Sequence, residues 1–204
     1  MLKSRFGFGF DTTIRRVVPC LFHPRVHPNA LSAVGTVVSL LAAADFAAGN
    51  FRRGALLTAV GGAFDLTDGV VARAQGRATR FGAFLDSSLD RLVDVALLLG
   101  LALHYAANGE RLWAGVAGVA LAGSVMTSYT KARAEFWLRD FSGGLLERAE
   151  RILILIAGGL LGAMPLALSV VAVGSVATSA QRIIIAYRRL GREGAGNESK
   201  EASP

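Results

Sequence analysis

The stretch FDLTDGVVARAQGRATRFGAFLDSSLD, residues 64–90, places four aspartates, Asp65, Asp68, Asp86 and Asp90, in a strongly apolar chain. Of the 204 residues, 52% are hydrophobic, and the mean hydropathy is +0.46. An uncompensated aspartate costs roughly 2.5–3.5 kcal/mol at the centre of a transmembrane helix. Four aspartates in so short a stretch therefore predict a partner that neutralises them.

Apolar runs on both sides of this stretch predict an all-α polytopic membrane protein, because each run approaches the roughly 20 residues that cross a bilayer. The expected fold has six transmembrane helices preceded by an N-terminal interfacial amphipathic helix. The spans are expected at about 30–48, 54–75, 82–107, 112–133, 146–163 and 165–187. The chain then divides into an interfacial helix in 1–24, a membrane domain in 25–190 and a disordered cytoplasmic tail in 191–204.

The positive charges predict how the chain is oriented. Most of the 22 Lys and Arg residues fall in the N-terminal segment, in the second-to-third and fourth-to-fifth connections, and after the sixth span. With six spans these segments share one side, which the positive-inside rule assigns to the cytoplasm. We therefore expect a multi-pass protein of the cell membrane, with both termini and the acidic stretch facing the cytoplasm.

The spacing of the acidic residues indicates that their side chains converge. Asp65 and Asp68 share one face of the second span with Gly69, Ala72 and Arg73, since these residues follow at i+3, i+4, i+7 and i+8. Asp86 and Asp90 are four residues apart and share a face of the third span. The connection QGRATR is short, with Gly76 to relieve the turn, and so predicts that the two spans are antiparallel neighbours.

Converging carboxylates predict a metal site. The ligands would all be oxygen, which favours Mg²⁺, with Mn²⁺ as the alternative. Four carboxylates can bridge two divalent cations, an arrangement used in phosphoryl transfer. The neighbouring Gly69 and Gly82 leave room beside the backbone, and Arg73 offers a bidentate phosphate partner. A diphosphate substrate is therefore expected.

The complete pattern resembles the signature of the CDP-alcohol phosphotransferase family, also called CDP-alcohol phosphatidyltransferases. It reads Asp65-x2-Asp68-Gly69-x2-Ala72-Arg73-x8-Gly82-x3-Asp86-x3-Asp90. The resemblance extends from about Asn29 to Arg182. It implies a phospholipid-synthesising transferase with six transmembrane helices behind an interfacial helix, assembled as a homodimer.

The resemblance also implies a role for each residue of the pattern. Asp65, Asp68 and Asp86 would hold the two metal ions, with Asp90 as a further ligand and as the general base for the acceptor hydroxyl. The nucleotide of CDP-diacylglycerol would be bound by seven residues: Asn29, Ser32, Gly69, Ala72, Arg73, Thr79 and Gly82. The phosphorus bonded to the lipid would be attacked, and CMP would leave.

Two later stretches, SYTKARAE (128–135) and GGLLERAERI (143–152), bear on the acceptor. Together with the sixth span they supply the candidate acceptor-phosphate ligands Lys131, Arg133, Arg148, Arg151 and Arg182. The stretches resemble those of prokaryotic phosphatidylinositol phosphate synthases, although Ala149 stands where proline is expected. Inositol phosphate is thus the predicted acceptor, and glycerol 3-phosphate, as in a phosphatidylglycerophosphate synthase, stays open.

Three further acidic residues lie beside these candidates. Glu147 and Glu150 are expected to orient the arginines. Asp94, one turn after Asp90, is expected either to support the acidic site or to pair with Arg91.

A transporter or channel is the alternative class, because intramembrane carboxylates can also mark an ion path. The acids, however, gather at one end of two spans, and broken helices in inverted repeats are not evident. This favours the enzyme. The expected partners are CDP-diacylglycerol, a phosphorylated polyol, membrane lipids and a second copy of the chain, with no nucleic acid.

Overall fold

The computed structural model describes residues 27–138 and 141–201, with side chains as far as residue 191. This part of the chain forms helices and contains no strand. The helices are α3 (Pro28–Ala47), α4 (Phe51–Ala74), α5 (Arg80–Ala107), α6 (Arg111–Trp137), α7 (Arg148–Leu161) and α8 (Met164–Glu201). The predicted interfacial helix in 1–24 lies outside the described residues.

Local sequence signals account for several helix boundaries. Pro28 occupies the first turn of α3, where its missing N–H costs nothing. Thr79 precedes α5, and its Oγ1 accepts a hydrogen bond from the Gly82 backbone N–H at 2.9 Å. Gly76 turns the chain between α4 and α5 with φ +64°, as expected, and Gly162 ends α7 with φ +70°.

Four of these helices are long and apolar enough to cross a membrane: α3, α4, α6 and the Met164–Gly191 part of α8. Helix α5 has 28 residues but carries Asp86, Asp90 and Asp94 between its N-terminus and its middle. Helix α7 has 14 residues, about 21 Å of helix. The fold is therefore the expected multi-pass helical bundle, with the spanning character of α3, α4, α6 and α8 supported directly by length and composition.

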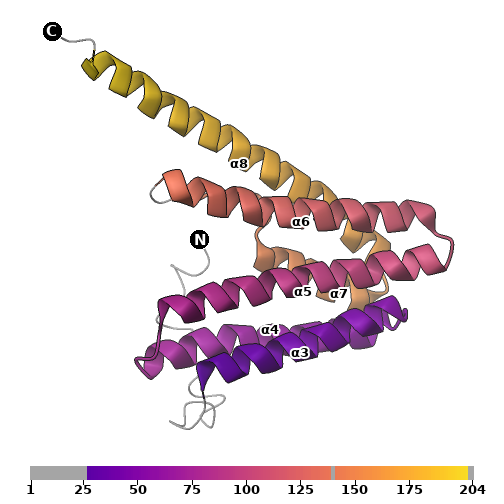
Figure 1. Ribbon diagram of the computed structural model, residues 1–204. Coiled ribbons are helices and arrows are strands. Elements are labelled where there is room, and N and C mark those ends of the chain that lie inside the picture. The colour runs from indigo at the N-terminus through magenta and orange to yellow at the C-terminus, as the bar shows by residue number, and fades with distance from the viewer. Residues whose placement is uncertain (1–26, 139–140, 202–204) are drawn as a thin grey trace.

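Successive helices run antiparallel (Figure 1). Helix α3 packs against both α4 and α5, α5 against α6, α6 against α8, and α7 against α4 and α8. The pair α4 and α5 is not among those in extensive contact. The two helices run antiparallel, as expected, but they do not pack extensively against one another, because α3 supplies the main contacts of both.

The core is filled by large apolar side chains, and small residues let the helices around it approach one another closely. Its largest fully buried members include Phe46, Leu97, Leu101, Leu155, Met164 and Leu168. Helices α3 and α5 approach so closely at Gly100 that an added Cβ would collide with the Ala43 carbonyl. Small residues allow this kind of backbone approach between membrane helices.

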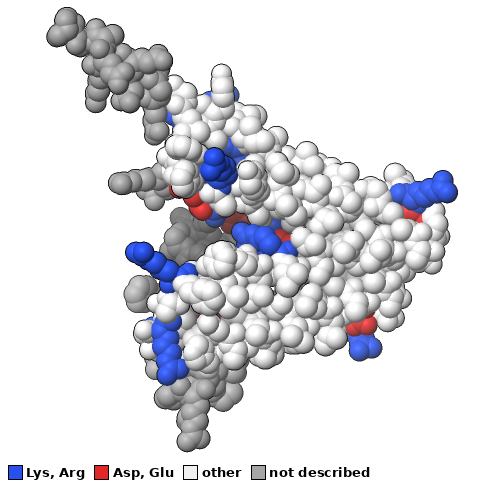
Figure 2. Space-filling model, in the orientation of Figure 1, with Lys and Arg blue, Asp and Glu red and all other residues white. Residues whose placement is uncertain are grey.

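The α4–α5 connection, which lies within the acidic stretch, and the α6–α7 connection, which links the two basic stretches, lie at the same end of the bundle (Figure 1). Figure 2 shows a broad white middle, with blue atoms gathered toward this end and red atoms beside them in a recess. Smaller charged groups lie at the opposite end. The fold therefore brings the predicted catalytic and acceptor segments to one end of the molecule.

Helix α8 runs to Glu201 and so extends into the segment 191–204 that was predicted as a disordered tail. Only its backbone is described beyond residue 191. Disorder of this segment in solution stays a prediction.

Candidate metal and diphosphate site

Three of the four predicted metal ligands form a compact cluster. Asp65 and Asp68 lie one turn apart on α4, and Asp86 comes from the second turn of α5. One carboxylate oxygen from each lies within 4.8 Å of the other two. Asp68 is buried, and the other two are half-buried. This all-oxygen set fits a hard divalent cation, because carboxylates are the ligands that Mg²⁺ and Mn²⁺ prefer.

Helix α3 reaches this cluster through a hydroxyl group. Ser32 Oγ donates a short hydrogen bond to Asp68 Oδ2, so a predicted nucleotide residue contacts a predicted metal ligand. Asn29, one turn earlier, places its Oδ1 3.7 Å from the position of an added Cβ on Gly82. The start of α3 therefore lies beside the first turns of α5, although the two segments are some fifty residues apart.

The remaining predicted nucleotide residues lie on α4 and at the start of α5. Arg73 Nη1 is 3.4 Å from where a Cβ on Gly69 would stand, so the guanidinium lies over this glycine. Ala72 is half-buried on the same helix. Thr79 uses its hydroxyl to cap α5. The seven predicted residues thus come from the same end of α3, α4 and α5.

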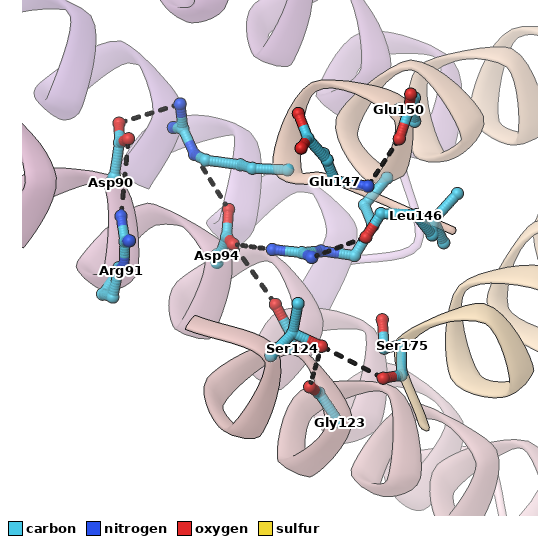
Figure 3. A network of polar contacts seen from close by, with 12 residues as sticks. Asp90, Arg91, Asp94, Gly123, Ser124, Leu146, Glu147, Glu150 and Ser175 are labelled. Carbon is cyan, nitrogen blue, oxygen red and sulfur yellow. Dashed lines mark hydrogen bonds and ion pairs between the residues drawn. The ribbon is translucent and has the colours of Figure 1, made fainter. Parts of the chain in front are cut away.

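Asp90, the fourth carboxylate, is joined to this site by an arginine. Arg148 Nη1 lies 2.8 Å from Asp90 Oδ1 and 2.9 Å from Asp65 Oδ2 (Figure 3 shows the Asp90 contact). Arg91 Nη1 lies 3.6 Å from Asp90 Oδ2 on the other side. The predicted acceptor residue Arg148 therefore sits between two predicted metal ligands on different helices.

Asp94 is the centre of a buried polar network (Figure 3). Its side chain is 7% exposed and accepts from Arg148 Nε at 3.3 Å and Arg151 Nη2 at 2.9 Å. Ser124 Oγ donates to it at 3.2 Å. Of the two expectations for Asp94, support of the acidic site fits these contacts, and the ion pair of Arg91 is with Asp90 instead.

Arg182, also predicted to bind the acceptor phosphate, is 4% exposed and donates to two backbone carbonyls. Its Nε lies 2.7 Å from the Gly143 oxygen and its Nη1 2.5 Å from the Thr127 oxygen. In addition, the Leu146 N–H donates to Thr178 Oγ1 at 2.9 Å. Helix α8 therefore holds the α6–α7 connection in place and ties it to α6.

Glu147 and Glu150 form a capping box at the start of α7. The Glu147 N–H donates to Glu150 Oε2 at 2.5 Å, and the Glu147 side chain accepts from the backbone N–H of Glu150. The two glutamates were expected to orient the arginines. They satisfy backbone groups of the first turn, and so fix the helix start on which Arg148 and Arg151 are mounted.

Lys131 and Arg133 contact residues of their own helix, α6. Lys131 Nζ lies 3.8 Å from Glu135, in an exposed pair. The Arg133 guanidinium lies over the rings of Phe136 and Trp137, with centroid distances of 5.4 and 5.7 Å. These contacts differ from those of Arg148 and Arg151, which reach the carboxylates of α4 and α5.

Some polar residues around the site were missed by reasoning from sequence, namely Ser124, Thr127 and Thr178. All three are buried, at 0–2% exposure, and hydrogen-bonded. The signal that could have found them is a polar stripe on an apolar helix: Ser175, Thr178, Ser179 and Arg182 stand at positions i, i+3, i+4 and i+7 of α8, on one face. Such a stripe indicates a buried polar seam toward α6.

Similar proteins of known sequence cover almost the entire chain. It is 38% identical over its full length to a phosphatidylinositol phosphate synthase of Streptomyces avermitilis, 89% of which is covered. It is 36% identical to an archaetidylinositol phosphate synthase of Pyrococcus horikoshii, with 87% of this chain and 92% of the relative aligned.

Solved structures show the same similarity. The crystal structure of Mycobacterium tuberculosis phosphatidylinositol phosphate synthase with CDP-DAG bound superposes with a TM-score of 0.75 at 32% identity, covering 87% of this chain and 93% of that one. The structure of the same enzyme with manganese and citrate gives a TM-score of 0.76 at 32% identity, covering 87% and 88%. Residues 25–187 match the sequence profile of CDP-alcohol phosphatidyltransferases. With the signature aspartates gathered at one end of α4 and α5, and relatives aligned over most of its length, the chain belongs to the CDP-alcohol phosphatidyltransferase family.

Proposed function

We propose that this protein transfers the phosphatidyl group of CDP-diacylglycerol to a hydroxyl group of inositol phosphate, with release of CMP. The observation that carries the proposal is the position of Arg148, a cation that links the acidic cluster on α4 and α5 to the basic α6–α7 segment. This position of Arg148 supports a donor site and a site for a phosphorylated acceptor that would lie side by side. The relatives named archaetidylinositol phosphate synthase and phosphatidylinositol phosphate synthase support the same acceptor.

The carboxylate cluster is the proposed metal centre. Asp65, Asp68 and Asp86 would hold the ions, with Asp90 as an additional ligand, and their convergence within 4.8 Å supports this assignment. Two Mg²⁺ ions, or Mn²⁺ in their place, would neutralise the diphosphate and stabilise the charge that develops on the leaving CMP.

The donor nucleotide is proposed to lie over the first turns of α3 and α5 and the last turns of α4. Asn29, Ser32, Gly69, Ala72, Arg73, Thr79 and Gly82 would line it. Arg73 above Gly69 can pair with the diphosphate, while Gly82 leaves the backbone accessible beside Asn29. The diacylglycerol tails would remain in the membrane.

Asp90 is the proposed general base. It would take the proton of the acceptor hydroxyl as that oxygen forms a bond to the lipid-linked phosphorus, and the bond from this phosphorus to the CMP oxygen would break. Its side chain is 17% exposed and faces Arg148, which supports a position between donor and acceptor. A positioned base of this kind contributes roughly 10²–10⁴-fold to the rate.

The proposed binding site for the acceptor phosphate is formed by five basic residues with different roles: Lys131, Arg133, Arg148, Arg151 and Arg182. Arg148 is the member nearest the catalytic carboxylates, and its side chain is 26% exposed. Arg151 and Arg182 are buried and would form the wall behind it. Lys131 and Arg133 would contribute charge from α6.

In the membrane, we propose that α5 and α7 complete a set of six spans, preceded by an interfacial helix in 1–24. Both termini and the site would face the cytoplasm, at the end where the basic connections lie. We also propose a homodimer in the cell membrane. A cysteine-accessibility scan of single substitutions in the α3–α4 and α4–α5 connections would test this orientation.

The reaction is tested with purified protein, CDP-diacylglycerol and Mg²⁺, following CMP release with inositol phosphate, glycerol 3-phosphate and unphosphorylated inositol in separate reactions. Release with inositol phosphate is expected. Release with glycerol 3-phosphate alone would make the protein a phosphatidylglycerophosphate synthase instead. No release with any acceptor would rule out the transferase assignment.

A further inference from the structure

We propose that Arg148 couples metal binding to acceptor binding, because its guanidinium competes with a cation for Asp65 and Asp90 and becomes available to the acceptor phosphate once displaced. This inference rests on the proposed function. It gives Arg148 two alternative partners, the metal-binding carboxylates and the acceptor.

The first step of the argument is the position of Nη1. It lies 2.9 Å from Asp65 Oδ2 and 2.8 Å from Asp90 Oδ1, and so joins carboxylates of α4 and α5 as a bridging cation would. A guanidinium and a divalent cation at such distances from the same oxygens repel one another strongly, since their charges have the same sign. Arg148 and an ion that bridges Asp65 and Asp90 therefore exclude one another.

The second step is the anchor of the same side chain. Arg148 Nε lies 3.3 Å from Asp94 Oδ1. Asp94 lies outside the three-carboxylate cluster and is fixed by Arg151 and Ser124. The Nη1 end can therefore leave Asp65 and Asp90 while the Nε end keeps its carboxylate. Asp94 is a positioning residue for this movement.

The third step concerns where the freed end can go. The Arg148 side chain is 26% exposed, whereas that of Arg151 is 3% exposed. Its backbone is held at the start of α7 by the capping box of Glu147 and Glu150, so the movement is confined to the side chain. A guanidinium with two free N–H groups beside Asp90 suits a phosphate ester, which it can bind with two hydrogen bonds.

These three steps predict reciprocal coupling. If a metal ion frees Arg148 for the acceptor, the acceptor must raise the affinity for the metal by the same factor. Removal of the guanidinium should abolish this coupling. It should also strengthen metal binding in the absence of acceptor, because a competitor is lost.

The test is a Mn²⁺ titration of the full chain in nanodiscs, in which free Mn²⁺ is followed by electron paramagnetic resonance. Arg148→Gln is expected to lower the Mn²⁺ dissociation constant by about three- to tenfold without substrates. Arg91→Gln is the matched control, since Arg91 also lies beside Asp90 but at 3.6 Å and with 42% exposure. It is expected to change the constant by less than about twofold.

The second arm repeats the titration with saturating inositol phosphate. Wild type should bind Mn²⁺ more tightly than without it, and Arg148→Gln should show no such change. Equal or weaker Mn²⁺ binding by Arg148→Gln would overturn the proposal, as would an equal effect of Arg91→Gln. Persistence of the full coupling in Arg148→Gln would also overturn it.

If Arg148→Gln does not yield folded protein, Arg148→Lys provides the same test. Lysine keeps the positive charge but lacks the planar guanidinium that forms two parallel hydrogen bonds. A reduced coupling supports the proposal, and unchanged affinity and coupling overturn it. The titration without acceptor needs no turnover, so its outcome is separate from that of the CMP assay. If glycerol 3-phosphate produces the coupling in place of inositol phosphate, the acceptor is reassigned and the competition by Arg148 stands.

Discussion

Arg151 and Asp94 form a buried ion pair, in which Arg151 Nη2 lies 2.9 Å from Asp94 Oδ2 and the side chains are 3% and 7% exposed. Asp94 belongs to α5 and Arg151 to α7, 57 residues later. The pair therefore fixes the start of α7 to the helix that carries Asp86 and Asp90.

Arg151→Met should lower the free energy of unfolding by about 3–5 kcal/mol, because Asp94 would lose a principal partner while it stays buried. Thermal unfolding in detergent measures this loss. Lys131→Met is the control, since its pair with Glu135 is exposed and should contribute no more than about 1 kcal/mol. Equal losses in the two variants would contradict a stabilising role for the buried pair.

Asp90→Asn should reduce CMP release by roughly 10²–10⁴-fold, because the amide cannot take the hydroxyl proton. Binding of CDP-diacylglycerol should remain within a few fold of wild type, since Asp65, Asp68 and Asp86 remain. Single-turnover assays and equilibrium binding of labelled donor measure the two effects. Near-normal transfer by this variant would end the assignment of Asp90 as the base.

Arg182→Ala should raise the Michaelis constant for inositol phosphate at least tenfold, because the α6–α7 connection loses its hydrogen bonds to α8 and the acceptor loses a nearby charge. The constant for CDP-diacylglycerol should change far less, since the proposed donor site lies on α3, α4 and α5. Initial rates with each substrate varied in turn separate the two constants. Equal increases in both would indicate a general structural role.

Glu150→Ala should destabilise the protein by about 1 kcal/mol, because the N–H of Glu147 would lose its acceptor at the start of α7. Glu150→Gln is the matched control, since its amide oxygen can accept the same hydrogen bond. Chemical or thermal unfolding of both variants provides the comparison. Similar losses would mean that the charge of Glu150, and not the capping hydrogen bond, is what matters.

Gly100→Ala should lower the free energy of unfolding by about 1–3 kcal/mol, because its methyl group would collide with the Ala43 carbonyl and push α5 away from α3. Gly118→Ala is the control, since an added Cβ there meets nothing within 4 Å. That substitution should be neutral or slightly stabilising, through the higher helix propensity of alanine. Equal destabilisation at both positions would contradict the close approach of α3 and α5.

The helices could be predicted from short-range rules, and the acidic cluster from the same rules together with the short connection between α4 and α5. Apolar run length sets the approximate helix bounds, and the three- and four-residue spacings place Asp65 with Asp68 and Asp86 with Asp90. Gly76 and Thr79 mark the turn between the two helices. These local features need no knowledge of how distant helices pack.

The partners of the arginines could not be predicted in the same way. Arg148, Arg151 and Arg182 were predicted as acceptor-phosphate ligands, yet Arg151 and Arg182 are buried and Arg148 bridges α4 and α5. Their contacts depend on the packing of α7 against α4 and α8, which pairs segments 39–83 residues apart. The packing of α3 against both α4 and α5 was not predicted, for the same reason.

Arg182 holds the α6–α7 connection against α8. The residues proposed for the donor and those proposed for the acceptor come from different halves of the chain. The proposed donor residues lie within 29–90, whereas the residues proposed to face the acceptor lie within 124–182. Polar contacts from Ser124, Arg148 and Arg151 join the second part to carboxylates of the first. If the proposed acceptor wall is correct, a chimera that keeps these three residues and their aspartates but takes the rest of its second half from a relative should acquire that relative's acceptor preference.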